Sequence, residues 1–204
     1  MGGLLATAAA GHALGLASVG LASIGLVAPA QANGIDLATL MALLARRTGG
    51  ETRFTEERTV AALDAPLRSS GRLSFQAPDR FARHTELPRP ESMEVQGNIA
   101  VLRRGTRTRQ LALDTIPELA ALASAMRGTL TGNAEALRHH FILRVSGQVE
   151  RWTLTLTPRS AQLAGSIDTI EIQGAGSDVR SIAIAMPSGD RSLMLIEPLK
   201  APVP

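Results

Sequence analysis

Short segments of alternating polar and apolar residues, separated by turn signals at intervals of roughly 8 to 12 residues, constrain this chain most. The clearest alternation runs from Trp152 to Thr157, where every second residue is threonine. In the segment from Leu67 to Gln76, Leu73 and Phe75 share one face and polar residues occupy the other. A period of two is typical of an antiparallel strand with one buried face. The sequence therefore predicts a mainly β fold.

Eleven segments follow this pattern and are predicted to be strands. They are 51–61, 67–76, 80–87, 92–95, 99–104, 107–113, 140–146, 151–157, 167–173, 179–185 and 192–197. Three other segments have helical spacing. Segment 35–47 can be capped at its start by Asp36 or Asn33, segment 116–126 starts near Pro117 and stops at Gly128, and segment 134–139 is shorter. The two later helices interrupt the strands.

Residues 1–32 are predicted to be a signal peptide. They contain no Lys, Arg, Asp or Glu, have an apolar stretch at 14–27, and end in the small-x-small sequence Ala30-Gln31-Ala32. The alternative is an uncleaved membrane anchor, since the apolar stretch approaches spanning length. Cleavage would leave a chain starting at Asn33. We expect one domain at 33–198 and a disordered Pro-rich tail at 199–204.

Composition argues against several classes of function. The chain has four Phe, one Trp and no Tyr, which is unfavourable for a protein that stacks nucleic-acid bases. It has no Cys, and therefore no disulfide, thiolate nucleophile, Cys-based metal site or acylated N-terminal Cys. The pI of about 10.8 accompanies a net charge of only +3. The pI is high because, with no Tyr, no Cys and the single Lys200, almost nothing titrates between pH 7 and the deprotonation of Arg.

The densest basic group is predicted to lie on one hairpin. It consists of Arg103, Arg104, Arg107 and Arg109. One interpretation is a solvated strand face. The other is a docking patch for anionic head groups or an acidic partner protein.

Motifs for catalysis or metal binding are not apparent. There is no Gly-x-Ser-x-Gly, Walker or HExxH sequence. His139 and His140 are adjacent and should point apart, which argues against a metal site. Glu56 and Glu57 should alternate between the faces of a strand, which argues against an acid/base pair. We expect no catalytic residue, no metal and no cofactor.

Five short motifs occur in an order that resembles the periplasmic lipoprotein carriers of the LolA type and their LolB and LolA-like relatives. They are Phe54-Thr-Glu56, Gly71-Arg-Leu-Ser-Phe75, Pro78-Asp-Arg-Phe81, Gly97-Asn98 before Ile99-Ala-Val-Leu102, and Trp152-Thr-Leu-Thr-Leu-Thr-Pro158. The resemblance implies an incomplete antiparallel β-barrel (a half-barrel) covered by short helices that act as a lid. It also implies a hydrophobic cavity.

Two departures from the family pattern concern the lid and the passenger. Ala77 stands where the lipoprotein carriers place an Arg that helps to close the lid, and the hairpin after Gly97 lacks the family's aromatic residues. We therefore expect closure to depend chiefly on apolar contacts. A lipid-conjugated pigment or polyketide is an alternative passenger to a lipoprotein.

The resemblance implies a monomeric, non-enzymatic periplasmic carrier for the acyl chains of a lipoprotein or lipid-conjugated passenger. Its partners would be an inner-membrane exporter and an outer-membrane acceptor, and not nucleic acid. The alternative is a periplasmic protein that senses lipid or lipoprotein and acts through a membrane partner. The apolar faces predict the cavity residues, with the 116–126 face forming either a lid or ordinary core. These residues are Phe54, Leu73, Phe75, Phe81, Val95, Leu119, Leu122, Met126, Trp152 and Leu154.

Overall fold

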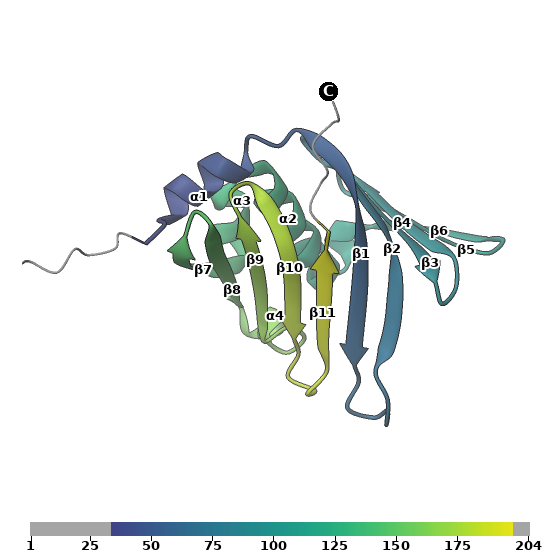
Figure 1. The fold of residues 1–204 in the computed structure, drawn as a ribbon. Coiled ribbons are helices and arrows are strands. Elements are labelled where there is room, and N and C mark those ends of the chain that lie inside the picture. Colours follow the sequence, from purple (N-terminus) through teal and green to yellow (C-terminus); the bar gives the residue numbers. More distant parts are fainter. Residues whose placement is uncertain (1–33, 198–204) are drawn as a thin grey trace, which may run out of the picture. The chain divides into compact units, whose positions relative to one another are not determined.

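Eleven antiparallel strands form one sheet in the computed structural model, which describes residues 34–197 (Figure 1). The predicted signal peptide at 1–32 and tail at 199–204 lie outside the described residues. The strands are β1 (Gly49–Thr59), β2 (Leu67–Gln76), β3 (Arg80–Leu87), β4 (Glu91–Gln96), β5 (Ile99–Arg104), β6 (Arg107–Ala112), β7 (Phe141–Gln148), β8 (Arg151–Pro158), β9 (Thr169–Ala175), β10 (Asp178–Ala185) and β11 (Arg191–Ile196). Every predicted strand is present.

The sheet is two meanders joined at the first and last strands. Its order is β6-β5-β4-β3-β2-β1-β11-β10-β9-β8-β7, and Phe54 of β1 pairs with Ile196 of β11. The outer strands β6 and β7 are not paired with each other. The chain passes from one to the other through a 3₁₀ turn (Leu113–Thr115) and two helices. The barrel is therefore incomplete, as predicted.

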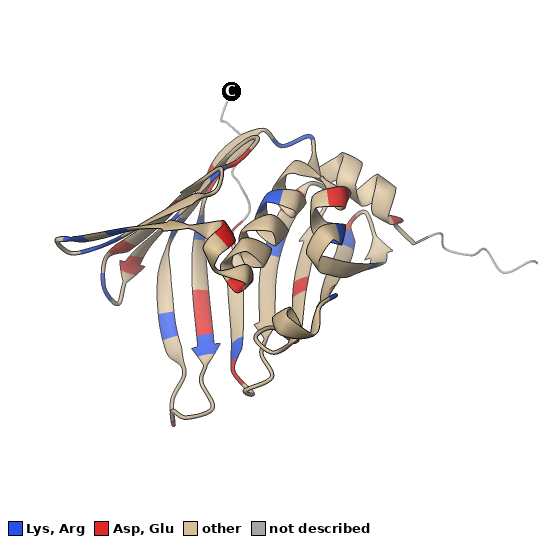
Figure 2. Cartoon of the chain, turned by 180° about the vertical axis from the view of Figure 1, so that it is seen from behind, with Lys and Arg blue, Asp and Glu red and all other residues tan. Residues whose placement is uncertain are grey.

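The helices are α1 (Leu37–Leu44), α2 (Pro117–Thr131), α3 (Ala134–His140) and α4 (Ala161–Ala164). Asp36 caps α1 by accepting a hydrogen bond from the Thr39 amide at 2.7 Å. Helix α4 was not predicted; Ser160 Oγ accepts a hydrogen bond from the Leu163 amide at its start. Figure 2 shows α2 and α3 in front of the inner face of the sheet. The helices thus cover the half-barrel on one side.

Helix α2 continues past Gly128, where the sequence predicted its end. A Cβ at Gly128 would lie 2.7 Å from Leu137 Cγ, so the missing side chain makes room for α3. The helix ends instead at Gly132, which has a left-handed φ of 65°. Gly128 therefore serves close packing between two helices and not termination.

The inner face of the sheet is buried in two separate clusters. The larger one packs α1, α3 and part of α2 on strands β7 to β10, with Leu40, Leu137 and Trp152 all fully buried. The smaller one contains Phe81, Val95, Ala100, Leu113 and Ala123. Helix α2 contributes Ala121 and Ala125 to the first cluster and Ala123 to the second. It therefore bridges the two halves of the sheet.

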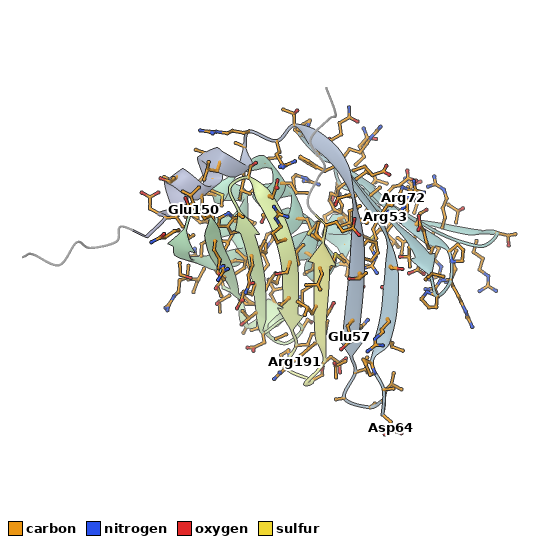
Figure 3. All side chains as sticks on the ribbon, in the orientation of Figure 1. Arg53, Glu57, Asp64, Arg72, Glu150 and Arg191 are labelled. Atoms are coloured by element: carbon orange, nitrogen blue, oxygen red, sulfur yellow. The ribbon has the colours of Figure 1, made fainter. Side chains whose placement is uncertain are left out.

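The outer face of β1 to β5 carries pairs of opposite charge. Arg53 and Arg72, labelled in Figure 3, are neighbours across β1 and β2, and both approach Glu86. At the hairpin that holds the basic group, Arg103 pairs with Glu94 on the outer face, whereas Arg104 pairs with Glu91 on the face that also carries Met93. Such exposed pairs contribute little stability, about 0 to 1 kcal/mol each. Two of the four hairpin arginines are thus compensated within the sheet.

Candidate functional site

A cavity of about 320 Å³ lies between α2 and the inner face of the sheet. Its size falls at the lower end of the range of roughly 300 to 1,000 Å³ that is typical of small-molecule sites. More than half of the lining residues have apolar side chains. They are Leu44, Leu73, Phe75, Phe81, Ala82, Met93, Leu122, Met126, Leu130, Ile172, Val179, Ile182, Ile184, Met194 and Ile196. The walls can therefore hold an apolar group away from water.

Five of the ten residues predicted for the cavity line it: Leu73, Phe75, Phe81, Leu122 and Met126. Phe75 of β2 pairs directly with Phe81 of β3, so their rings stand on the same inner face. Leu122 and Met126 are four residues apart on α2 and face the sheet together. Strand alternation and helical spacing thus bring these side chains to one place.

Trp152 and Leu154 do not line the cavity, although they share the inner face of the sheet. Both are fully buried in the larger core cluster. The Trp152 ring lies over Gly174 on the neighbouring strand, where a Cβ would stand 2.2 Å from Cζ2. Its Nε1 donates a hydrogen bond to the Gly176 carbonyl at 2.9 Å. Trp152 and Leu154 pack with residues of α1 and α3 in this cluster and are therefore core.

The other three predicted residues are also core. Val95 is buried in the smaller cluster, and Leu119 packs against that cluster. Phe54 points to the cavity side of β1 but is 1% exposed. Arg83 covers it, with the guanidinium carbon 4.6 Å from the ring centroid. Phe54 thus supports the cavity wall from below.

Several wall residues were not predicted from the sequence, above all those of β10 and β11. Ile182 pairs with Met194, and both face the cavity. Their period-two spacing was visible in the sequence. What the sequence did not show was that β11 would pair with β1, which leaves only β1 between the last strands and Leu73 and Phe75 of β2.

The cavity also contains charged groups at two places along β1. Near Gly50, Arg47 forms an ion pair with Asp178, and Arg47 Nε donates to the Ser177 carbonyl at 3.1 Å. Farther along, Glu56 Oε2 accepts a hydrogen bond from Arg83 Nη2 at 2.6 Å. Glu56 and Glu57 lie on opposite faces of the strand, because Glu57 pairs with Arg68 outside. No local sequence pattern singled out Arg83, and Glu56 was considered there only as an acid/base partner of Glu57.

Two opposing effects set the pKa of Glu56. Burial raises the pKa, but hydrogen bonds from Arg83 and Ser192 and the positive charge of Arg83 lower it more. The net result is a pKa below the ordinary value of 4.5. The carboxylate is therefore ionised at neutral pH and is a poor general base.

A metal-binding cluster is not evident among residues 34–197, where no three His, Asp or Glu side chains come together. The rings of His139 and His140 do not point apart as expected: their centroids are 4.6 Å apart and the rings meet edge to face. Burial lowers the pKa of His140 most, and the charge of the neighbouring His139 lowers it further.

Within residues 34–197, no helix has both the length and the apolar character needed to cross a membrane.

Comparison with solved structures finds similar folds at low sequence identity. A LolA superfamily protein from Nitrosomonas europaea is 8% identical, with 83% of this chain and 96% of that chain covered and a TM-score of 0.44. A DUF1329 family protein from Desulfovibrio piger is 9% identical, covers 82% and 91%, and has a TM-score of 0.47. A putative outer membrane lipoprotein-sorting protein domain from Vibrio parahaemolyticus is 10% identical, covers 82% and 91%, and has a TM-score of 0.43.

Comparison with curated proteins finds no match. The sequence family described as outer membrane lipoprotein carrier protein LolA-like matches residues 28–198. The match spans well over half of the chain and includes every strand and helix of the half-barrel. The protein therefore belongs to the LolA-like family of outer membrane lipoprotein carrier proteins.

Proposed function

We propose that this protein is a periplasmic carrier that holds an acyl chain of a lipid or lipoprotein in the cavity under α2 during transfer to the outer membrane. The observation that supports it is the apolar cavity itself, walled by aliphatic, Met and Phe side chains of eight elements. Each methylene withdrawn from water contributes about 0.8 kcal/mol. A barrel filled by its own side chains would have favoured a purely structural role.

The walls suit a passenger of variable shape. Met93, Met126 and Met194 line the cavity, and unbranched Met side chains adapt to different apolar surfaces. Family membership adds a donor and an acceptor to the proposal: an exporter in the inner membrane and a receptor in the outer membrane. The carrier itself would act as a monomer.

Export is part of the same proposal. It requires removal of residues 1–32 after Ala32. We expect the protein isolated from the periplasm of an expression host to have the intact mass of a chain starting at Asn33. A chain that retains residues 1–32 and sediments with membranes would contradict export as a free carrier.

The central experiment is native mass spectrometry of the periplasmic protein, followed by extraction and identification of the bound lipid. We expect a lipid adduct in the wild type and its loss in Leu73→Glu, which places a charge in the cavity wall. The matched control is Leu195→Glu, because Leu195 is 52% exposed and lies outside the cavity. Loss of the adduct in both variants, or in neither, would contradict binding in this cavity.

A lipid-transfer assay distinguishes a carrier from the alternative, a lipid sensor. Protein loaded with a fluorescent acyl lipid is mixed with acceptor vesicles. A carrier accelerates delivery above the rate of spontaneous exchange of the lipid. Stable binding without acceleration would favour a sensor that acts through a membrane partner.

A further inference from the structure

Four strands bring polar side chains together on the inner face of the sheet. Glu56 comes from β1, Ser69 from β2, Arg83 from β3 and Ser192 from β11. Ser192 Oγ donates to Glu56 Oε1 at 2.6 Å, and Ser69 Oγ donates to Glu56 Oε2 at 3.1 Å. Arg83 Nη2 donates to Glu56 Oε2 at 2.6 Å and to Ser69 Oγ at 3.1 Å. The cluster is thus held rigidly from four directions.

The charged pair is largely buried and faces the cavity. The side chains of Glu56 and Arg83 are 16% and 25% exposed, and both line the cavity wall. Removing two charges from water is costly, and a well-packed apolar pair of similar volume often stabilises a fold equally well. Stability alone therefore does not explain why charged side chains occupy this position. Contact with the ligand is the alternative explanation.

Arg83 has hydrogen-bonding capacity that the protein does not use. Its Nε donates to Thr85 Oγ1 at 3.3 Å, and its Nη2 is occupied by Glu56 and Ser69. Within residues 34–197, Nη1 donates no hydrogen bond to the protein. A guanidinium has five N–H groups in a fixed fork. The planar group also stacks on Phe54, which fixes its direction. The unused donors therefore have a defined orientation.

The charge balance of the cavity selects the kind of acceptor. Its charged residues are Arg47, Arg83, Glu56, Asp178 and Glu197, so acidic groups outnumber basic ones. An ionised carboxylate or phosphate placed at Arg83 would also approach the carboxylate of Glu56. A neutral carbonyl oxygen accepts the same hydrogen bond without that repulsion.

We propose that Arg83, held in place by Glu56, is a specificity determinant that binds the carbonyl oxygen of a neutral acyl ester or amide. The inference rests on the proposed carrier function and adds the chemistry of the passenger's linkage. At a rise of about 3.3 Å per residue, Glu56 lies about 20 Å along β1 from Gly50. The apolar wall of the cavity along this stretch receives the acyl chain, and the carbonyl group of the chain lies at Arg83.

The test compares three fluorescent probes that share one pyrene-labelled chain: a methyl ester, the ionised free fatty acid and the alkane. We expect wild-type protein to bind the ester about tenfold more tightly than the alkane, as one hydrogen bond to a charged donor provides. The fatty acid should bind more weakly than the ester. Thermal unfolding and circular dichroism accompany each titration.

The variant is the double replacement Glu56→Gln with Arg83→Met, which removes both charges and leaves neither buried alone. It should bind the alkane as tightly as the wild type and lose the preference for the ester. The matched control is Arg72→Met with Glu86→Gln, an ion pair of the same type on the outer face. That control should keep the preference.

Arg83→Lys provides a second variant if the double replacement does not fold, because it keeps the charge but loses the planar fork. It should reduce the ester preference several-fold. An equal ester preference in wild type and folded variants, or stronger wild-type binding of the fatty acid than of the ester, would overturn the inference alone. If none of the three probes binds, the proposed carrier function fails as well.

Discussion

Arg127 of α2 donates a hydrogen bond from Nη2 to the backbone carbonyl of Gly97 at 2.6 Å. Gly97 lies in the turn between β4 and β5, so this contact ties the helix to the far half of the sheet. Because Ala77 stands where the family resemblance implies a lid arginine, we expected α2 to rest chiefly on apolar contacts. A hydrogen bond from an arginine therefore also holds α2 to the sheet in this protein, but the arginine belongs to the helix and not to the strand hairpin that contains Ala77.

We expect Arg127→Met to release the passenger faster. Loss of one hydrogen bond from a charged donor weakens the attachment of α2 by about 1.5 kcal/mol, which corresponds to an off-rate raised about tenfold. The measurement is the off-rate of a fluorescent lipid. Arg138→Met is the control, since Arg138 pairs with Glu135 on the surface of α3. An off-rate equal to that of this control would contradict a role in retention.

Substitutions of two leucines of α2 distinguish whether this helix acts as a lid or is ordinary core. Leu122 lines the cavity, whereas Leu119 packs against the smaller core cluster. Leu122→Ser should raise the passenger off-rate about tenfold or more, because it removes about 1.5 to 3 kcal/mol of apolar contact. Leu119→Ser should lower thermal stability and leave the off-rate close to that of the wild type. If Leu122→Ser costs stability without changing the off-rate, the segment is fixed core.

Glu56 should make stability depend on pH in the acid range. Because its pKa in the folded protein lies below the ordinary 4.5, the ionised form stabilises the fold at higher pH. This stabilisation is lost as the pH falls from 4.5 through the folded pKa. Urea unfolding across that interval should show a shallower pH dependence for Glu56→Gln than for the wild type. Identical slopes for the two proteins would show that other carboxylates carry the effect.

Gly128→Ala should destabilise the protein, although Ala is intrinsically the better helix former by about 1 kcal/mol. The new Cβ would lie 2.7 Å from Leu137 Cγ, and Leu137 is fully buried. Overpacking of this kind costs about 1 to 3 kcal/mol. The expected result is a lower midpoint in thermal or urea unfolding. A higher midpoint would mean that α3 shifts without strain.

The strands were predictable because each carries its own alternation, as in the segment from Leu67 to Gln76. The cavity was predictable only in part, since alternation tells which side chains share a face and not which part of that face a helix covers. Trp152 and Phe75 have the same local pattern, yet one is core and the other lines the cavity. Glu56 and Arg83 depend on pairing between β1, β2 and β3, which no local pattern reveals.

The pairing of β1 with β11 has a consequence for the order of folding. Within each half of the sheet the strands are linked by local hairpins, which close quickly. Phe54 and Ile196, in contrast, meet from nearly opposite ends of the described chain, and contacts so distant in sequence are slow to form. The cavity straddles this seam, with Thr52 and Glu56 on one side and Ser192 and Met194 on the other. A newly made chain thus has a complete cavity only after β11 has paired with β1.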